Sequence, residues 1–207
     1  MNMRIIELRP SRPHLHGATL AQEDLSTALS SFSALNGDSA VFLLNLSNAT
    51  SVTGSYLRAT LHWALLCGQA AVSQPAHPPS HGQWSVKPLP LFPMVVAPSA
   101  VVAEEVHDFF GARNLPLLQA LKWTKSEITS VRLVGVLDSF LLGTLLKLAR
   151  FGEATAGELA DKSKEEITPN AWSNRLAALF MLRLVTRNRV GKFWKYAPIA
   201  KEIQSWG

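Results

Sequence analysis

The sequence has very little cysteine. Cys67 is the only one in 207 residues, and a single cysteine cannot form an internal disulfide or supply a thiolate-rich zinc site or an iron–sulfur cluster. The sequence also lacks the motifs GxxxxGK[ST], GxGxxG after a strand, HExxH and GxSxG, which are typical of nucleotide-binding and hydrolytic enzymes. We therefore expect no cofactor, no metal site and no enzymatic activity.

The histidines offer a metal-binding alternative. His14 and His16 are separated by one residue, and His77 and His81 lie further along the chain. These residues fall in proline-rich segments, so we interpret them as exposed loop histidines rather than as metal ligands.

Long hydrophobic runs are also absent. The first residues carry a charge every few positions and lack the apolar segment that a signal peptide requires. Residues 131–149 are apolar but are interrupted by Arg132, Asp138 and Lys147, so they fall short of a membrane span. Because 47% of the chain is apolar and 17% is charged, it has enough material for a core. We expect a soluble, cytoplasmic protein of one large or two small domains, with no membrane partner.

Acidic residues are missing from one part of the chain. Residues 1–120 hold 6 Lys and Arg against 7 Asp and Glu, whereas residues 121–207 hold 14 against 8. Residues 168–201 contain seven basic residues and no acidic one. A dense surface of one sign attracts polyanions, because each Lys or Arg at a phosphate releases condensed counterions. A basic face that contacts only solvent is the alternative.

Strand and helix patterns alternate over residues 1–120, which favours a small α/β sheet. The predicted strands cover residues 5–8, 40–46 and 94–96, and the predicted helices cover residues 20–32, 56–66 and 100–110. Six prolines lie between residues 73 and 93, which predicts a loop there.

Helical patterns dominate after Trp123. Thr124 and Glu127 match a capping box, and the apolar positions from Ile128 to Leu148 follow helical spacing with a break near Asp138. The predicted organisation is an α/β domain at residues 1–120 with a proline-rich loop at 73–93, a linker helix at 121–138, and a second domain at 139–207.

The second domain is predicted to contain three helices and a hairpin. The first helix covers residues 140–150, the second begins at a capping box formed by Thr155 and Glu158, and the third begins at Thr168 with Pro169 in its first turn. Two alternating segments, residues 184–187 and 193–196, flank a predicted turn at residues 188–191.

This order of elements resembles the winged helix-turn-helix of bacterial transcription regulators. The resemblance covers residues 139–200 and depends on residues 155–160 for the second helix, residues 172–179 for the recognition helix and residues 184–187 at the start of the wing. It implies that the recognition helix enters the major groove of duplex DNA with its polar face. Arg183 departs from the pattern, because such families often place a glycine there to end the recognition helix.

Candidate DNA-binding residues lie on the predicted recognition helix and wing. Trp172, Leu176 and Leu179 recur at core spacing, which leaves polar residues outside, where Asn can pair with adenine and Ser can hold phosphate. The wing adds cations for the DNA backbone or the minor groove. The candidates are Asn170, Ser173, Asn174, Arg175, Arg187, Arg189, Lys192 and Lys195.

The aromatic residues of this domain have two interpretations. We interpret Trp172, Phe193, Trp194 and Tyr196 as core residues. The alternative is that Phe193 and Trp194 stack on the bases of RNA or single-stranded DNA.

Residues 45–57 carry a second resemblance. This segment, Asn-Leu-Ser-Asn-Ala-Thr-Ser-Val-Thr-Gly-Ser-Tyr-Leu, resembles the phosphorylation loop of STAS domains, the family of anti-sigma-factor antagonists, and the likeness extends over residues 1–70 and loosely over 90–115. In that family the loop carries an Asp-Ser pair whose Ser is phosphorylated by a partner kinase. Here the pair is Thr53-Gly54, so Thr53 and Ser55 are the candidate regulatory residues, and they are equally candidates for the helix N-cap.

The predicted fold class is a small STAS-like α/β domain followed by a C-terminal winged helix-turn-helix domain. The predicted function is that of a prokaryotic transcription regulator that binds duplex DNA as a homodimer. The STAS-like domain would mediate dimerisation or receive a signal from a protein partner. The alternative is a non-enzymatic adaptor that joins proteins in a larger complex and does not contact DNA.

Overall fold

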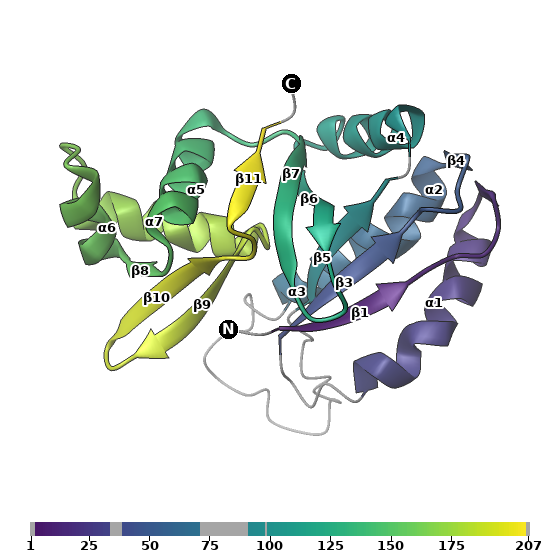
Figure 1. Ribbon diagram of the computed structural model, residues 1–207, viewed down its shortest axis with the longest axis horizontal. Helices are drawn as coiled ribbons and strands as arrows, with labels where there is room; N and C mark the ends of the chain where they lie inside the picture. The colour runs from purple at the N-terminus through teal and green to yellow at the C-terminus, as the bar shows by residue number, and fades with distance from the viewer. Residues whose placement is uncertain (1–2, 34–38, 71–90, 98, 206–207) are drawn as a thin grey trace. The chain divides into compact units, whose positions relative to one another are not determined.

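The computed structural model describes residues 3–33, 39–70, 91–97 and 99–205, which form a mixed α/β structure (Figure 1). The chain divides into two compact units, Met1–Ala103 and Glu104–Gly207. This division lies within α4 (Ala100–Gly111), whereas the first domain was predicted to end at residue 120. Among the described residues, no helix combines the length and the apolar character needed to cross a membrane.

The first unit contains three parallel strands. These are β1 (Arg4–Leu8), β3 (Ala40–Asn45) and β5 (Leu91–Val96), with β3 paired to both neighbours. Every residue of β3 and β5 is buried, as expected for parallel strands whose two faces are covered. The three predicted strands are therefore confirmed.

The end of the predicted proline-rich loop is wrong, because residues 91–93 begin β5. Pro93 pairs with Phe42 in the parallel register. Proline lacks only its N–H, and its fixed φ is compatible with an extended strand. Residues 73–90 of the predicted loop lie outside the described residues.

Two helical segments connect these strands. The first is α1 (Ala18–Ser33), and the second is formed by α2 (Gly54–Leu57), the π-helical turn η1 (Arg58–His62) and α3 (Trp63–Ala70) in succession. The helix α1 packs on β1 and on η1, and α3 packs on β5. The hydroxyl of Tyr56 donates a 2.6 Å hydrogen bond to Asp24 of α1, and burial together with this carboxylate raises the pKa of Tyr56.

A two-stranded ribbon is formed by the segments that lie just before the two helical segments, β2 (His14–Leu15) before α1 and β4 (Ser51–Val52) before α2. In it β2 pairs in parallel with β4. Leu15 and Val52 are buried, so His14 and Ser51 lie on the opposite, outer face of the ribbon.

The predicted linker helix at residues 121–138 is wrong. Its residues belong to β6 (Pro116–Trp123) and β7 (Ile128–Gly135), which form an antiparallel hairpin in the second unit. The strand β11 (Glu202–Gln204), which was not predicted, pairs in parallel with β7. Several residues of β7 are β-branched, and such side chains pack better on a pleated strand than in a helix.

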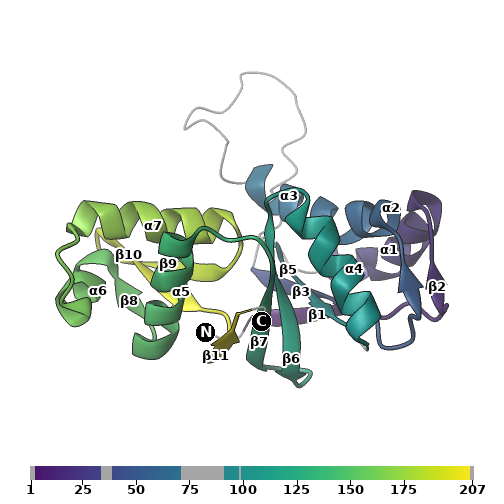
Figure 2. The same cartoon turned by 90° about the horizontal axis from the view of Figure 1, so that it is seen from above.

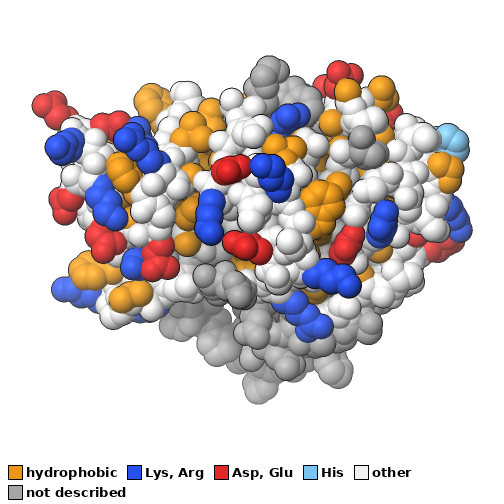
Figure 3. All heavy atoms as spheres, in the orientation of Figure 1, with side chains coloured by type: hydrophobic (Ala, Val, Ile, Leu, Met, Phe, Trp, Pro, Cys, Tyr) orange, Lys and Arg blue, Asp and Glu red, His pale blue; other side chains and the backbone are white. Residues whose placement is uncertain are grey.

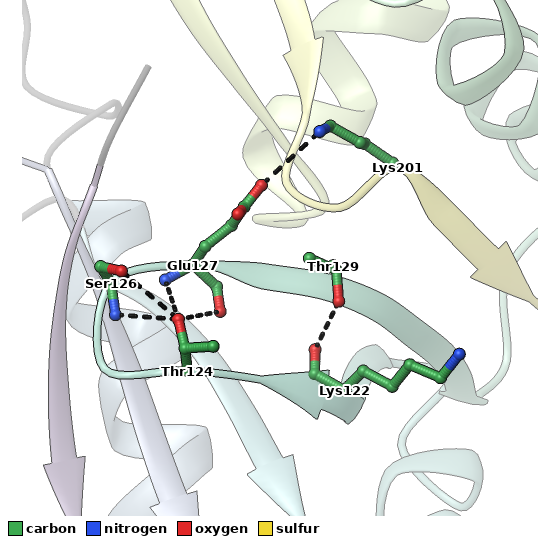
Figure 4. A network of polar contacts seen from close by, with 6 residues as sticks. All are labelled: Lys122, Thr124, Ser126, Glu127, Thr129 and Lys201. Carbon is green, nitrogen blue, oxygen red and sulfur yellow. Dashed lines mark hydrogen bonds and ion pairs between the residues drawn. The ribbon is translucent and has the colours of Figure 1, made fainter.

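Thr124 and Glu127 close this hairpin instead of starting a helix (Figure 4). The hydroxyl of Thr124 accepts hydrogen bonds from the N–H groups of Ser126 and Glu127, and the Thr124 N–H donates to the Glu127 carbonyl at 2.7 Å. The Glu127 carboxylate lies 3.7 Å from Lys201 and does not return to the Thr124 N–H as a capping box requires. The Thr-x-x-Glu pattern that predicted a capping box therefore forms the turn between β6 and β7.

Three helices and a hairpin occupy residues 139–198, as predicted. The elements are α5 (Ser139–Phe151), β8 (Ala154–Thr155), α6 (Ala156–Ser163), α7 (Pro169–Met181), β9 (Val185–Val190) and β10 (Phe193–Pro198). Thr155 and Glu158 form both bonds of a capping box, and the Thr168 hydroxyl caps α7, whose first residue is Pro169. The predicted N-termini of α6 and α7 are confirmed.

The core of this segment comes from one side of each helix. Both α5 and α6 pack on α7, and α7 also packs on β9 (Figure 2). The buried apolar residues are Leu145, Leu148, Leu159, Trp172, Leu176 and Leu179. Because each helix has its apolar residues on one face, the opposite face of α7 remains in solvent.

Gly135 provides a test of the packing between α4, β6 and β7. Its φ is +77°, and a Cβ there would lie 2.2 Å from the Leu115 carbonyl oxygen and 3.0 Å from the Phe110 Cβ. We expect Gly135→Ala to lower the free energy of unfolding by about 2–4 kcal/mol, from left-handed strain and overpacking. The measurement is urea denaturation followed by circular dichroism.

The control for this test is Gly143→Ala in α5, where an added Cβ meets no atom within 4 Å. Alanine in a helix interior should raise the free energy of unfolding by about 0.5–1 kcal/mol. Equal effects of the two substitutions would contradict this description of Gly135.

Candidate nucleic-acid interface

The outer face of α7 carries polar side chains over its first two turns. Asn170, Ser173 and Asn174 are exposed, while Trp172 is fully buried. The helical spacing of Trp172, Leu176 and Leu179 predicts this division, and the structure confirms it. Amide and hydroxyl groups on one exposed helix face can hydrogen-bond to base edges or to phosphate oxygens.

Arg175 lies against aromatic rings rather than with this polar face. Its guanidinium carbon is 5.2 Å from the ring centre of Phe140 in α5 and 5.5 Å from that of Trp172. These distances are typical of cation–π contacts. Arg175 therefore helps to join α7 to α5, which sequence spacing alone did not indicate.

The hairpin that follows α7 has a two-residue loop. Phe193 pairs with Val190, so the loop consists of Gly191 and Lys192. Gly191 has a φ of +60°, which a glycine adopts without strain. The predicted turn at residues 188–191 is therefore wrong at its start, since residues 188–190 belong to β9.

Arg187 is held between two aromatic rings. Its guanidinium carbon lies 4.1 Å from the ring centre of Phe180 and 4.2 Å from that of Trp194, and the guanidinium of Arg189 lies 5.7 Å from the same Trp194 ring. Both distances are within the range of cation–π contacts. Arg187 therefore attaches the hairpin to α7 through Phe180.

The prediction that Trp172, Phe193, Trp194 and Tyr196 are core residues is half wrong. Trp172 and Tyr196 are buried, as predicted, but Phe193 is 58% exposed and Trp194 is 41% exposed. The reason is their place near the loop end of the hairpin, which projects away from α5, α6 and α7 (Figure 1).

Lys195 forms an ion pair that the charge pattern of residues 168–201 did not reveal. Its Nζ lies 2.8 Å from the Glu153 carboxylate, because β8 pairs with β10 and places Thr155 opposite Lys195. The hydrogen bond with Glu153 raises the pKa of Lys195, and the charge of Glu158 adds to this effect. Part of the positive charge of Lys195 is therefore already compensated by Glu153, although no acidic residue lies within residues 168–201.

Arg183 has the backbone conformation of the glycine that it replaces. Its φ is +62°, and the hydrogen bonds Arg183 N–H to Phe180 O and Leu184 N–H to Leu179 O, both 3.0 Å, form the Schellman motif that ends α7. The side chain is 2% exposed and lies over the Phe180 ring. Burial and the nearby charge of Arg187 lower the pKa of Arg183 to about 10.

The candidate regulatory residues of the first unit lie where α2 begins. Thr53 is the N-cap residue of α2 but its side chain makes no capping hydrogen bond. Its hydroxyl instead accepts from the Gly17 N–H at 3.2 Å and lies 3.0 Å from the Ser55 hydroxyl. Thr53 therefore has the N-cap position that one of its two interpretations predicts, but its hydroxyl joins the start of α2 to the segment before α1 instead of capping the helix.

His14 and His16 lie beside this region, and both are exposed, as predicted. His16 lies in the segment between β2 and α1, whereas His14 belongs to β2 and not to a loop. Nδ1 of His14 and Nε2 of His16 are 3.1 Å and 3.0 Å from the hydroxyl of Ser51. His77 and His81 are outside the described residues. Within residues 3–33, 39–70, 91–97 and 99–205, no three His, Cys, Asp or Glu side chains come together as a metal site would require.

No family model, curated protein or solved structure matches the chain. The arrangement of residues 139–198 is therefore the principal guide to function. It places the exposed polar residues of α7 and the basic hairpin in one packed segment. Within this segment Lys195 is ion-paired with Glu153, and Arg175 lies over the ring of Phe140 in α5.

The capping box of α6 predicts a dependence of stability on pH. The Thr155 N–H donates to the Glu158 carboxylate at 2.7 Å, and this bond lowers the pKa of Glu158 below its ordinary 4.5. A lowered pKa stabilises the folded state above pH 4.5, and this contribution is lost as the pH falls through the lowered value. We expect the wild type to be more stable than Glu158→Gln at pH 7 and to lose that advantage in acid.

Urea denaturation at pH 7 and at acidic pH measures this difference, with the exposed Glu166→Gln as the control. Glutamine still accepts the backbone hydrogen bond, so the comparison isolates the charge. A difference between wild type and Glu158→Gln that stays constant with pH would contradict the assignment.

Proposed function

We propose that this protein is a prokaryotic, cytoplasmic transcription regulator that binds duplex DNA. In this proposal residues 139–198 act as a winged helix-turn-helix, α7 is the recognition helix and the hairpin β9–β10 is the wing. The first unit, with its STAS-like segment at residues 45–57, mediates homodimerisation or receives a signal from a protein partner.

One observation carries the proposal. The contact of Arg187 with Phe180, 4.1 Å from guanidinium carbon to ring centre, joins the basic hairpin to the last turn of α7, the helix whose first two turns expose Asn170, Ser173 and Asn174. A helix that presents amides to solvent beside an anchored cationic hairpin has the groups required for base edges and for phosphates.

The side chains of α7 and of the hairpin suit different contacts with DNA. Asn170 and Asn174 can each form a bidentate pair with adenine in the major groove, and Ser173 can hold a phosphate. Arg187, Arg189 and Lys192 carry charge that is suited to phosphates or to the minor groove. Lys195 contributes less, since Glu153 already pairs with it.

The test is a fluorescence-anisotropy titration of random-sequence duplex DNA at several salt concentrations. We expect log K to fall steeply with log salt for the wild type and less steeply for the triple variant Arg187→Ala, Arg189→Ala, Lys192→Ala. The matched control removes three exposed arginines of the first unit, Arg4, Arg9 and Arg58, and should keep the wild-type slope.

Absence of binding at low salt, or equal slopes for the triple variant and the control, would contradict the proposal. Co-purification with a protein in the absence of duplex affinity would then favour the adaptor. Circular dichroism of each variant is needed beside the titration, because Arg187 also packs against Phe180 and Trp194.

Two single substitutions separate base recognition from phosphate binding. On a duplex selected by the wild type from a random library, Asn174→Ala should cost about 1–3 kcal/mol of binding free energy and relax the preference at one position. Lys192→Ala should weaken binding to all sequences alike and reduce the salt slope by about 1. Sequence selection and anisotropy measure these effects, and a uniform loss for Asn174→Ala would contradict its role.

A substitution of Glu153 is expected to strengthen DNA binding, whereas the substitutions above weaken it. Glu153→Gln removes the carboxylate that lies 2.8 Å from Lys195, so Lys195 becomes available to a phosphate. We expect tighter binding to random duplexes and a steeper salt slope, by up to about 0.9 for one added phosphate contact. The same titration measures both, and weaker binding by this variant would argue against phosphate contact at Lys195.

A further inference from the structure

The loop end of the hairpin β9–β10 carries two exposed apolar side chains. Val190 is 55% exposed and Phe193 is 58% exposed, and the two residues are directly paired across the strands, next to the loop. Paired residues of an antiparallel ribbon have their side chains on the same face. We call this pair the apolar tip.

Cationic groups border the apolar tip. Nζ of Lys192 is 5.3 Å from the ring centre of Phe193, and Nε of Arg189 donates to the carbonyl of Gly191 at 3.3 Å, so both cations lie beside the loop. Figure 3 shows basic and apolar side chains side by side in the region of this hairpin, at the lower left. The tip is thus an apolar wedge with positive charge on its flanks.

We propose that the apolar tip inserts into the minor groove of duplex DNA, partly separates two stacked base pairs and bends the duplex. This inference rests on the proposed function and adds to it a particular contact. It takes duplex DNA as the occupant because of charge complementarity: phosphates line both edges of a minor groove, and Arg189 and Lys192 flank the tip.

The size and chemistry of the pair suit this role. The minor groove is about 6 Å wide, which admits the side chains at the end of a hairpin but not a helix. Apolar wedges such as Phe unstack base steps when they enter from the minor groove, and the cost is recovered because the bent duplex contacts more of the protein. Pyrimidine–purine steps open most readily, so the contact should favour TA and CA steps.

The experiment uses the full chain and a duplex of about 30 base pairs with a central TA step. Energy transfer between dyes at the two ends reports bending, and the fluorescence of 2-aminopurine beside the step reports unstacking. We expect both signals to rise on binding of the wild type. The double variant Val190→Thr, Phe193→Ser should bind about 10-fold more weakly, with an unchanged salt slope and with neither signal rising.

Two further variants make the result specific to the tip. Val101→Thr replaces an equally exposed apolar side chain, 59% exposed on α4 and outside residues 139–198, and should leave both signals at the wild-type level. Lys192→Ala should weaken binding but leave the bound duplex bent and unstacked. Circular dichroism confirms that each variant is folded before the comparison is made.

The outcomes separate this inference from the proposed function. Wild-type protein that binds the duplex without bending or unstacking it overturns the apolar-tip inference and leaves the proposed function standing. No binding to duplex at low salt overturns both. Stronger binding to single strands, or tip-dependent binding to phosphatidylglycerol vesicles in place of DNA, would also overturn it by assigning the tip to another partner.

Discussion

The burial of one row of side chains in α7 is the constraint on which the candidate interface depends. Trp172, Leu176 and Leu179 are fully buried, and α5 and α6 pack on α7. Each of these side chains contributes about 1.5–3 kcal/mol of hydrophobic free energy, which outweighs what any surface contact of α7 could contribute. The rotation of the helix about its axis is therefore determined by its core face, and Asn170 and Asn174 are exposed as a consequence.

The strand β10 connects this helix to the rest of the interface. It pairs with β9 on one side and with β8 on the other, so it brings Glu153, just before β8, to Lys195. On the opposite face of the hairpin, Trp194 of β10 and Phe180 of α7 enclose the guanidinium of Arg187. The pairing of β10 thus places Lys195 against a carboxylate and Arg187 against an aromatic ring. The positive charge of the hairpin is therefore partly neutralised at Lys195 but not at Arg187.

Helix starts were predicted well from sequence, and the region between the two predicted domains was not. Thr155 with Glu158 and Thr168 with Pro169 start helices as predicted, because a capping hydrogen bond joins residues three positions apart, such as the Thr168 hydroxyl and the Ala171 N–H. Thr124 and Glu127 have the same spacing but close the turn between β6 and β7. The two cases differ in the residues that come after the motif, since residues 128–134 are rich in β-branched side chains and pair with a distant strand.

The sequence by itself determined the caps of α6 and α7, the buried row of α7, its exposed polar residues and the excess of basic residues in the hairpin. These features depend on neighbours in the chain and on the helical period. Only the tertiary structure decided that Lys195 meets Glu153, that Arg175 lies over Phe140, that Arg187 contacts the rings of Phe180 and Trp194 and that Phe193 is exposed. Those contacts join residues from different elements, and they exist only once strand pairing and helix packing have brought the elements together.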